Sequence, residues 1–233
     1  MNAVLLAAGK GERLGVYTRK TPKPMLRIGG KPILEHNVEW CRDNGFTRLF
    51  INLHHRPDVI IKHFGDGSRF GVSIAYKRER SLLGTSGAVK NFADKLDGEP
   101  FLVVYGDNWV DYDLAAMMAR HRRSGADMSV AVFRLADARL SGLVTMNRAG
   151  RILSFVEKPQ SKKPVPGWVN AAVYVMNPAL LDEIPRGFSD FGRDVIPRLL
   201  KEGRLVQGIR MPHKVKAVDT PALYRKWAPT GIL

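Results

Sequence analysis

The sequence predicts an α/β fold with a mixed, mostly parallel sheet and helices on both faces. Short apolar segments typical of buried strands alternate along the chain with segments of helical periodicity. Hydrophobic residues make up 45% of the 233 residues, which is enough for a sizeable core. Alternating strands and helices favour parallel strand pairs, because each crossover helix returns the chain to the end of the sheet where the preceding strand began.

The first half of the chain shows this alternation most clearly. A strand at residues 2–7 leads into a glycine-rich turn. Pro32 suits the first helical position, and Leu34, Val38 and Cys41 follow at helical spacing up to a cap at Gly45. Further strands are expected at 48–53, 72–76 and 101–105, with helices at 57–63 and 86–95.

The second half mixes a hairpin with helices. Two strands, 141–146 and 151–156, are joined by a turn at residues 147–150, and the proline-containing segment 159–167 is expected to be a loop. Helices are expected at 113–124, 193–202 and near 220–227, and strands at 127–133, 168–176 and 204–210. Without a long linker, we expect one domain over 1–233, with a nucleotide-binding part at about 1–112 and a sugar-binding part at about 113–233.

The charge balance points to acidic partners. Lys and Arg number 37 against 22 Asp and Glu, a formal charge of +15. The basic residues are dispersed, so we expect phosphorylated small molecules rather than nucleic acid. The single Cys41, the lack of a charged leader and the lack of an apolar run of about 20 residues predict a cytoplasmic protein without membrane attachment.

The turn after the first strand contains Gly9 and Gly11. Such a turn lets backbone N–H groups approach phosphate oxygens. It matches neither the dinucleotide fingerprint, because Leu14 occupies the third glycine position, nor a phosphate-binding loop ending in Gly-Lys-Ser/Thr. An ordinary strand-to-loop turn is the alternative.

Lys23 lies between two prolines, which stiffen the backbone around it. A lysine on a rigid loop near a glycine turn can neutralise a polyphosphate. The alternative is an exposed loop lysine.

Several motifs together resemble the sugar-1-phosphate nucleotidyltransferase family in order and spacing. They are AAGKGERL (7–14), TPKPML (21–26), GKPIL (30–34), LGTSGA (83–88), GD (106–107), SGLV (141–144), FVEKP (155–159), NAAVY (170–174) and VDTP (218–221). The resemblance implies a Rossmann-like sheet of GT-A type. The chain departs from the family pattern at Asp219, which Thr220 and Pro221 follow without an intervening glycine, and at Ala172, where many relatives have glycine.

The resemblance also implies roles for particular residues. The turn at Ala8, Gly9 and Gly11 would wrap the triphosphate, with Arg13 on the phosphates and Lys23 as the charge on the α-phosphate. The remaining implied roles are nucleobase contact for Gly84 and Thr85, Mg²⁺ coordination for Asp107 and Asp219, and sugar-phosphate binding for Gly142, Glu157, Lys158 and Asn170.

Asp107 follows a predicted strand at the edge where open α/β sheets bind ligands, and Mg²⁺ prefers carboxylate and phosphate oxygens. If Asp107 and Asp219 share one ion, their carboxylates must approach within roughly 8 Å. A turn aspartate, a loop lysine at Lys158 and a backbone-bonded amide at Asn170 are the alternatives.

The resemblance therefore implies a magnesium-dependent enzyme whose partners are a nucleoside triphosphate and a sugar 1-phosphate. The loop at 83–88 resembles guanylyltransferases, which favours GTP with a mannose or manno-heptose 1-phosphate and a role in glycan biosynthesis. Uridylyl, thymidylyl or cytidylyl transfer remains open, as does a non-catalytic nucleotide-sugar sensor. We expect a monomer or homodimer without an appended left-handed β-helix.

Overall fold

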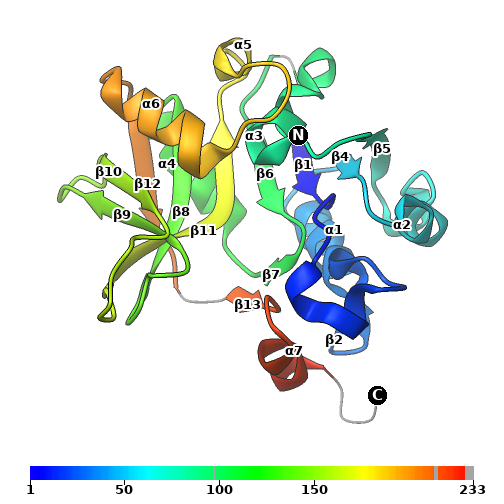
Figure 1. The fold of residues 1–233 in the computed structure, drawn as a ribbon. Coiled ribbons are helices and arrows are strands. Elements are labelled where there is room, and N and C mark those ends of the chain that lie inside the picture. Colours follow the sequence, from blue (N-terminus) through cyan, green and yellow to red (C-terminus); the bar gives the residue numbers. More distant parts are fainter. Residues whose placement is uncertain (97, 213–214, 229–233) are drawn as a thin grey trace. The chain divides into compact units, whose positions relative to one another are not determined.

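The computed structural model describes residues 1–96, 98–212 and 215–228, and its chain divides into two compact units (Figure 1). The first contains Met1–Leu82, Val104–Asp111 and the segment from Val215 on. The second contains Leu83–Val103 and Tyr112–Lys214. The chain crosses between the units at 82–83, at 103–104, at 111–112 and again before Val215, so neither unit is continuous in sequence.

Parallel strands form the sheet of the first unit. β1 (Asn2–Leu6), β4 (Arg48–Leu53) and β5 (Ser73–Arg78) pair in that order, with Val4 beside Phe50 and Phe50 beside Ala75. Parallel neighbours need crossover connections. Here α1 (Ile33–Asp43) lies between β1 and β4 in the chain, and α2 (Pro57–Phe64) lies between β4 and β5. Shorter elements are η1 (Glu12–Thr18), η2 (Lys23–Met25), β2 (Arg27–Ile28), β3 (Lys31–Pro32) and η3 (Ser68–Phe70).

A two-stranded ladder in the first unit joins distant parts of the chain. β6 (Phe101–Tyr105) leads to Gly106, whose N–H donates to the Leu6 carbonyl at 2.9 Å. β7 (Asn108–Val110) then pairs antiparallel with β13 (Val215–Ala217), with Asn108 beside Ala217. The sequence did not indicate these three-residue strands. Their register places residues 107 and 219 at the same end of the ladder.

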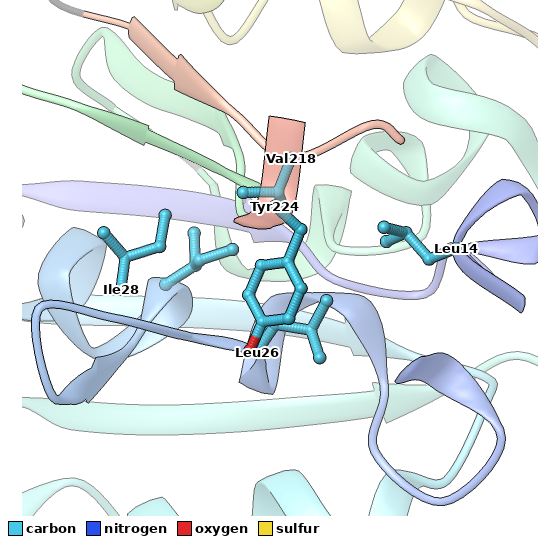
Figure 2. Close-up of a cluster of buried hydrophobic side chains, with 6 residues drawn as sticks. Leu14, Leu26, Ile28, Val218 and Tyr224 are labelled. Atoms are coloured by element: carbon cyan, nitrogen blue, oxygen red, sulfur yellow. The ribbon is translucent and has the colours of Figure 1, made fainter. Parts of the chain in front are cut away.

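The C-terminal helix of the first unit packs on the turns that follow β1. Thr220 is the N-cap of α7 (Pro221–Trp227), and its hydroxyl accepts from the Leu223 N–H. Its Tyr224 and the preceding Val218 are buried against Leu14, Leu26 and Ile28 (Figure 2). The residues beside Arg13 and Asp219 therefore belong to one apolar cluster.

The second unit is built on a mixed sheet with the strand order β10–β9–β11–β8–β12. Only the β8–β12 pair among these is parallel. The elements are α3 (Gly84–Lys90), η4 (Ala93–Lys95), α4 (Leu114–Ser124), β8 (Met128–Leu135), β9 (Gly142–Met146), β10 (Ile152–Glu157), β11 (Gly167–Met176), α5 (Leu180–Glu183), η5 (Phe191–Val195), α6 (Ile196–Lys201) and β12 (Val206–Arg210).

The predicted fold class is confirmed, and two of the expected helices differ in detail. The helix expected at 86–95 is α3 followed by a separate 3₁₀ turn, because Asn91, a weak helix former, ends α3 as its cap. The helix expected at 193–202 opens with a π turn at Phe191–Val195 before α6. Within the described residues, no helix is long and apolar enough to cross a bilayer.

Candidate active site

A pocket of about 370 Å³ lies over the turn that follows β1 in the first unit. Residues 9–14, Lys23, Leu82, Asp107 and Asp219 line it. The glycine turn, Arg13, Lys23 and both aspartates were each predicted as site residues, and the fold brings them together. Ala8, also predicted, is buried at 5% exposure and does not line the pocket.

Gly11 is required by both backbone conformation and space. Its φ of +65° lies in the left-handed region, which strains residues with a side chain. A Cβ there would stand 2.9 Å from Thr18 Cγ2 and 3.0 Å from Lys23 Cβ. The absence of a side chain at Gly11 therefore allows Lys23 to pass directly beneath the turn.

Lys23 is the centre of the pocket's charge. Its side chain is 6% exposed, and its ammonium lies 2.6 Å from Asp107 Oδ2 and 2.5 Å from Asp219 Oδ1. The interpretation of Lys23 as an exposed loop lysine is thus wrong. Arg13 Nη2 lies 3.4 Å from the same Asp219 oxygen, but its side chain is 65% exposed and this pair is weak.

The two carboxylates keep the lysine protonated. Burial by itself lowers the pKa of Lys23, but the charges and hydrogen bonds of Asp107 and Asp219 outweigh burial and raise that pKa above its ordinary value. Lys23 therefore carries a positive charge at neutral pH. Asp107 and Asp219 both face this ammonium, and Arg13 also lies near Asp219.

The two carboxylates lie within the roughly 8 Å that the hypothesis of a shared ion requires. Because both oxygens touch one nitrogen, they lie within about 5 Å of each other, whereas two Mg²⁺ ligands with bonds of about 2.1 Å lie about 3–4 Å apart. Both side chains are about one-third exposed. No group of three or more His, Cys, Asp or Glu side chains suited to a metal occurs among the described residues, so phosphates or water would have to complete the coordination.

A buried polar chain that sequence reasoning missed supports the start of the turn. The Ala7 N–H donates to Asn52 Oδ1, and Asn52 Nδ2 donates to Glu79 Oε1, both at 2.8 Å. Asn52 and Glu79 are 4% and 7% exposed. An asparagine inside the apolar strand β4 was the available signal, because a buried amide needs partners.

In the second unit, Asp190 holds the first turn of α3 at Gly84 and Thr85, a segment that the sequence motif had suggested to be a loop. The Thr85 N–H and hydroxyl both lie 3.0 Å from Asp190 Oδ1, and the Phe191 N–H donates to the Thr85 hydroxyl at 2.9 Å. A Cβ at Gly84 would stand 2.4 Å from the Ser189 carbonyl oxygen. Asp190 is thus a positioning residue for this helical turn, and no sequence motif predicted it.

The residues predicted to bind the sugar phosphate gather on β10, β9 and β11 in the second unit. Glu157 pairs with Gly142, and Val169 pairs with Leu143, so Asn170 and Gly142 are the next residues along their strands. A Cβ would come within 3.1 Å of Glu157 Oε2 at Gly142 and within 2.8 Å at Gly192. These two glycines leave the space that the Glu157 carboxylate occupies.

Left-handed backbone occurs at one of these residues and beside another. Lys158 has a φ of +50°. Ala172, two residues after Asn170, has a φ of +59° and lies where the β11–β8 register shifts. Asn170 spans the irregular segment: its Oδ1 accepts from the Ala172 N–H at 2.9 Å, and its Nδ2 donates to the Tyr174 hydroxyl at 2.6 Å. Residues held in such conformations cost about 1–3 kcal/mol each and concentrate at functional sites.

Comparison with known proteins gives a consistent result. The profile of the nucleotidyl transferase family matches residues 2–231. A UTP–glucose-1-phosphate uridylyltransferase of Synechocystis is 33% identical, over 91% of this chain and 58% of the relative. A mannose-1-phosphate guanylyltransferase of Mycobacterium tuberculosis is 35% identical, over 87% of this chain and 56% of the relative. The chain thus spans little more than half the length of these relatives.

The fold also matches a solved structure over nearly its whole length. HddC from Yersinia pseudotuberculosis superposes with a TM-score of 0.82 at 24% identity, covering 97% of both chains. At this identity the match establishes the architecture, in agreement with the predicted fold class.

The strain at Ala172 makes a testable prediction. Ala172→Gly should raise the free energy of unfolding by up to about 1 kcal/mol, because glycine adopts a positive φ without strain. Urea denaturation measures this change. The neighbouring Ala171, buried and without a positive φ, is the matched control, and Ala171→Gly should lower stability by about 1 kcal/mol. Destabilisation by both substitutions would show that the backbone at Ala172 is not strained.

Proposed function

Because the chain belongs to the nucleotidyl transferase family, we propose that it joins a nucleoside triphosphate to a sugar 1-phosphate and releases pyrophosphate. The observation that carries this proposal is the Lys23 ammonium held against Asp107 and Asp219 in a pocket lined by a glycine turn. In the reaction, an oxygen of the sugar phosphate forms a bond to the α-phosphorus. The bond from that phosphorus to the bridging oxygen breaks, and pyrophosphate leaves with the electron pair.

The residues of the first unit suit the triphosphate. Backbone N–H groups of the turn at Gly9 and Gly11 approach phosphate oxygens, and the exposed Arg13 adds a mobile positive charge. The protonated Lys23 stabilises the negative charge that develops on the α-phosphate. Ala8, Gly84 and Thr85 complete the proposed nucleotide-binding set, with Thr85 set in place by Asp190.

Asp107 and Asp219 are the proposed ligands of Mg²⁺. Their oxygens lie close enough for one octahedral ion after a small adjustment, and both carboxylates are accessible to solvent. When bound, the ion would offset the repulsion between the two phosphorylated substrates. Lys23 would then be free to turn its ammonium from the carboxylates toward a phosphate.

The second unit supplies the proposed sugar-phosphate subsite of Gly142, Glu157, Lys158 and Asn170. The Glu157 carboxylate accepts hydrogen bonds from sugar hydroxyls, while the Lys158 ammonium pairs with the phosphate.

GTP and a mannose or D-glycero-D-manno-heptose 1-phosphate are the proposed substrates, giving a GDP-sugar for glycan biosynthesis. The sequence motif at 83–88 and the guanylyltransferase names of several relatives support this choice. The Synechocystis relative supports uridylyl transfer to glucose 1-phosphate as the second candidate. A cytoplasmic location and a monomeric or homodimeric state remain predictions.

A matrix of substrates tests the reaction and its specificity. Four nucleoside triphosphates are combined with mannose, manno-heptose and glucose 1-phosphates, and pyrophosphate release is measured. The highest kcat/KM is expected for GTP with a manno-configured sugar. A maximum with UTP and glucose 1-phosphate would replace the guanylyl assignment, and binding without turnover in every combination would indicate a nucleotide-sugar sensor.

Removing the positive charge of Lys23 or the negative charge of Asp107 should abolish most turnover. Lys23→Ala and Asp107→Asn are each expected to lower kcat by about 10²–10³-fold, the cost of one lost electrostatic contact in a transition state. The matched control for Lys23→Ala is Lys20→Ala, which removes an exposed lysine three residues earlier.

Removal of the metal is a separate test. EDTA should stop wild-type turnover without moving the thermal unfolding transition, because the proposed metal is not structural. Near-normal turnover of Lys23→Ala, or full activity in EDTA, would refute the corresponding role.

Substitutions in the sugar subsite should affect one substrate only. Glu157→Gln and Asn170→Ala are expected to raise the KM of the sugar phosphate at least tenfold, because the sugar hydroxyls lose hydrogen-bond partners. The KM of the triphosphate should change little. Steady-state kinetics with each substrate varied in turn measures both constants. A larger change in the nucleotide KM would remove both residues from this subsite.

A further inference from the structure

A second pocket, of about 460 Å³, lies wholly within the second unit. The C-terminal end of α4, the turn between β9 and β10, and β12 form it. Arg120 and Arg123 line it from α4, and Arg210 lines it from β12. It shares no lining residue with the candidate active site.

The floor of this pocket is closely packed backbone. The Gly208 N–H donates to the Gly150 carbonyl at 2.8 Å, and Gln207 Nε2 donates to the Ala149 carbonyl at 3.0 Å. Gly150 has a φ of +87°, and a Cβ there would stand 2.4 Å from Gln207 Nε2. A Cβ at Gly208 would stand 2.1 Å from Met146 Sδ. The turn is thus fixed on β12, and the cavity keeps a defined shape.

The three arginines are exposed, and contacts restrain the Arg210 guanidinium. Arg210 Nη2 donates to the Asn147 carbonyl at 3.3 Å, and its guanidinium lies 5.6 Å from the centre of the Trp168 ring. Hydrogen bonding and cation–π contact together restrain this side chain. Arg120 and Arg123 are three residues apart, so both lie on one face of α4.

Nothing among the described residues neutralises these three charges. No carboxylate lines the pocket, and none forms an ion pair with the three arginines in the described part of the chain. The sequence reinforces this, because residues 114–126, 138–156 and 203–212 contain no Asp or Glu. Like charges that converge on one cavity repel one another, and a bound polyanion would relieve that repulsion.

We propose that this arginine pocket binds the phosphate groups of a small molecule carrying a di- or triphosphate. Guanidinium groups bind phosphate through paired hydrogen bonds, and three of them match the charge of a polyphosphate. A volume of about 460 Å³ falls within the range of small-molecule sites. The concave lining distinguishes it from the extended basic stripe that nucleic acid or an anionic bilayer contacts. The pocket also accounts for part of the +15 net charge.

Calorimetric titration with inorganic tripolyphosphate in EDTA tests the proposal. Wild-type protein is expected to show two sites, one in each pocket. Arg123→Gln should weaken one site about tenfold and leave the other unchanged, the loss expected for one charge-assisted contact. Arg122→Gln removes the same charge from the adjacent exposed position, outside the pocket, and should change neither site. Arg13→Ala should weaken only the site in the first unit.

The possible outcomes separate this proposal from the proposed function. A single site, lost with Arg13→Ala and unaffected by Arg123→Gln, would overturn the arginine pocket and leave the nucleotidyltransferase intact. Equal weakening by Arg122→Gln and Arg123→Gln would overturn it as well, because binding would then follow total charge. Binding of anionic vesicles or a single-stranded oligonucleotide that depends on Arg123 and resists competition by tripolyphosphate would also overturn it. Two sites without detectable turnover would support the pocket while the proposed activity fails.

Discussion

The ammonium group of Lys23 joins three parts of the chain that are far apart in sequence. It contacts Asp107 after β6 and Asp219 after β13, while its own backbone lies in the turn η2. An almost fully buried ammonium is stable only if carboxylates offset its lost hydration. The same two carboxylates would repel each other if the ammonium left. Under the proposed function, a cation that arrives with the triphosphate would offset this repulsion, and the position of Lys23 would then depend on metal binding.

Glycine residues leave room for the side chains of Lys23 and Glu157, one in each unit. Gly11 leaves room for Lys23 in the first unit, and Gly142 with Gly192 leaves room for Glu157 in the second. A side chain at any of these positions would occupy the space of a functional group rather than merely strain a turn. These three glycines therefore leave room for neighbouring side chains.

Much of this organisation follows from local sequence, and the remainder depends on distant contacts. The strands at 48–53 and 101–105 have the expected bounds, because continuous apolar segments between turn signals suffice to predict them. Asp107 and Lys23 were identifiable from motifs, but their ion pair was not, since it depends on the β7–β13 ladder formed by two three-residue strands. Asp190 and Glu79 escaped prediction because their partners lie 105 and 27 positions away. At Ala172, by contrast, a signal was present in the sequence: the residue departs from the family's glycine, and its backbone has a positive φ.

The discontinuity of the first unit has a consequence for protein synthesis. A ribosome releases β1, η1 and η2 long before it produces Val218, Asp219 and Tyr224, which complete the apolar cluster and the lysine's second ion pair. Domains generally fold as whole units during translation. The first unit must therefore wait, with Leu14, Leu26 and Ile28 lacking their final partners, until the intervening second unit has been translated. The pocket around Lys23 is therefore completed only after the second unit has been synthesised.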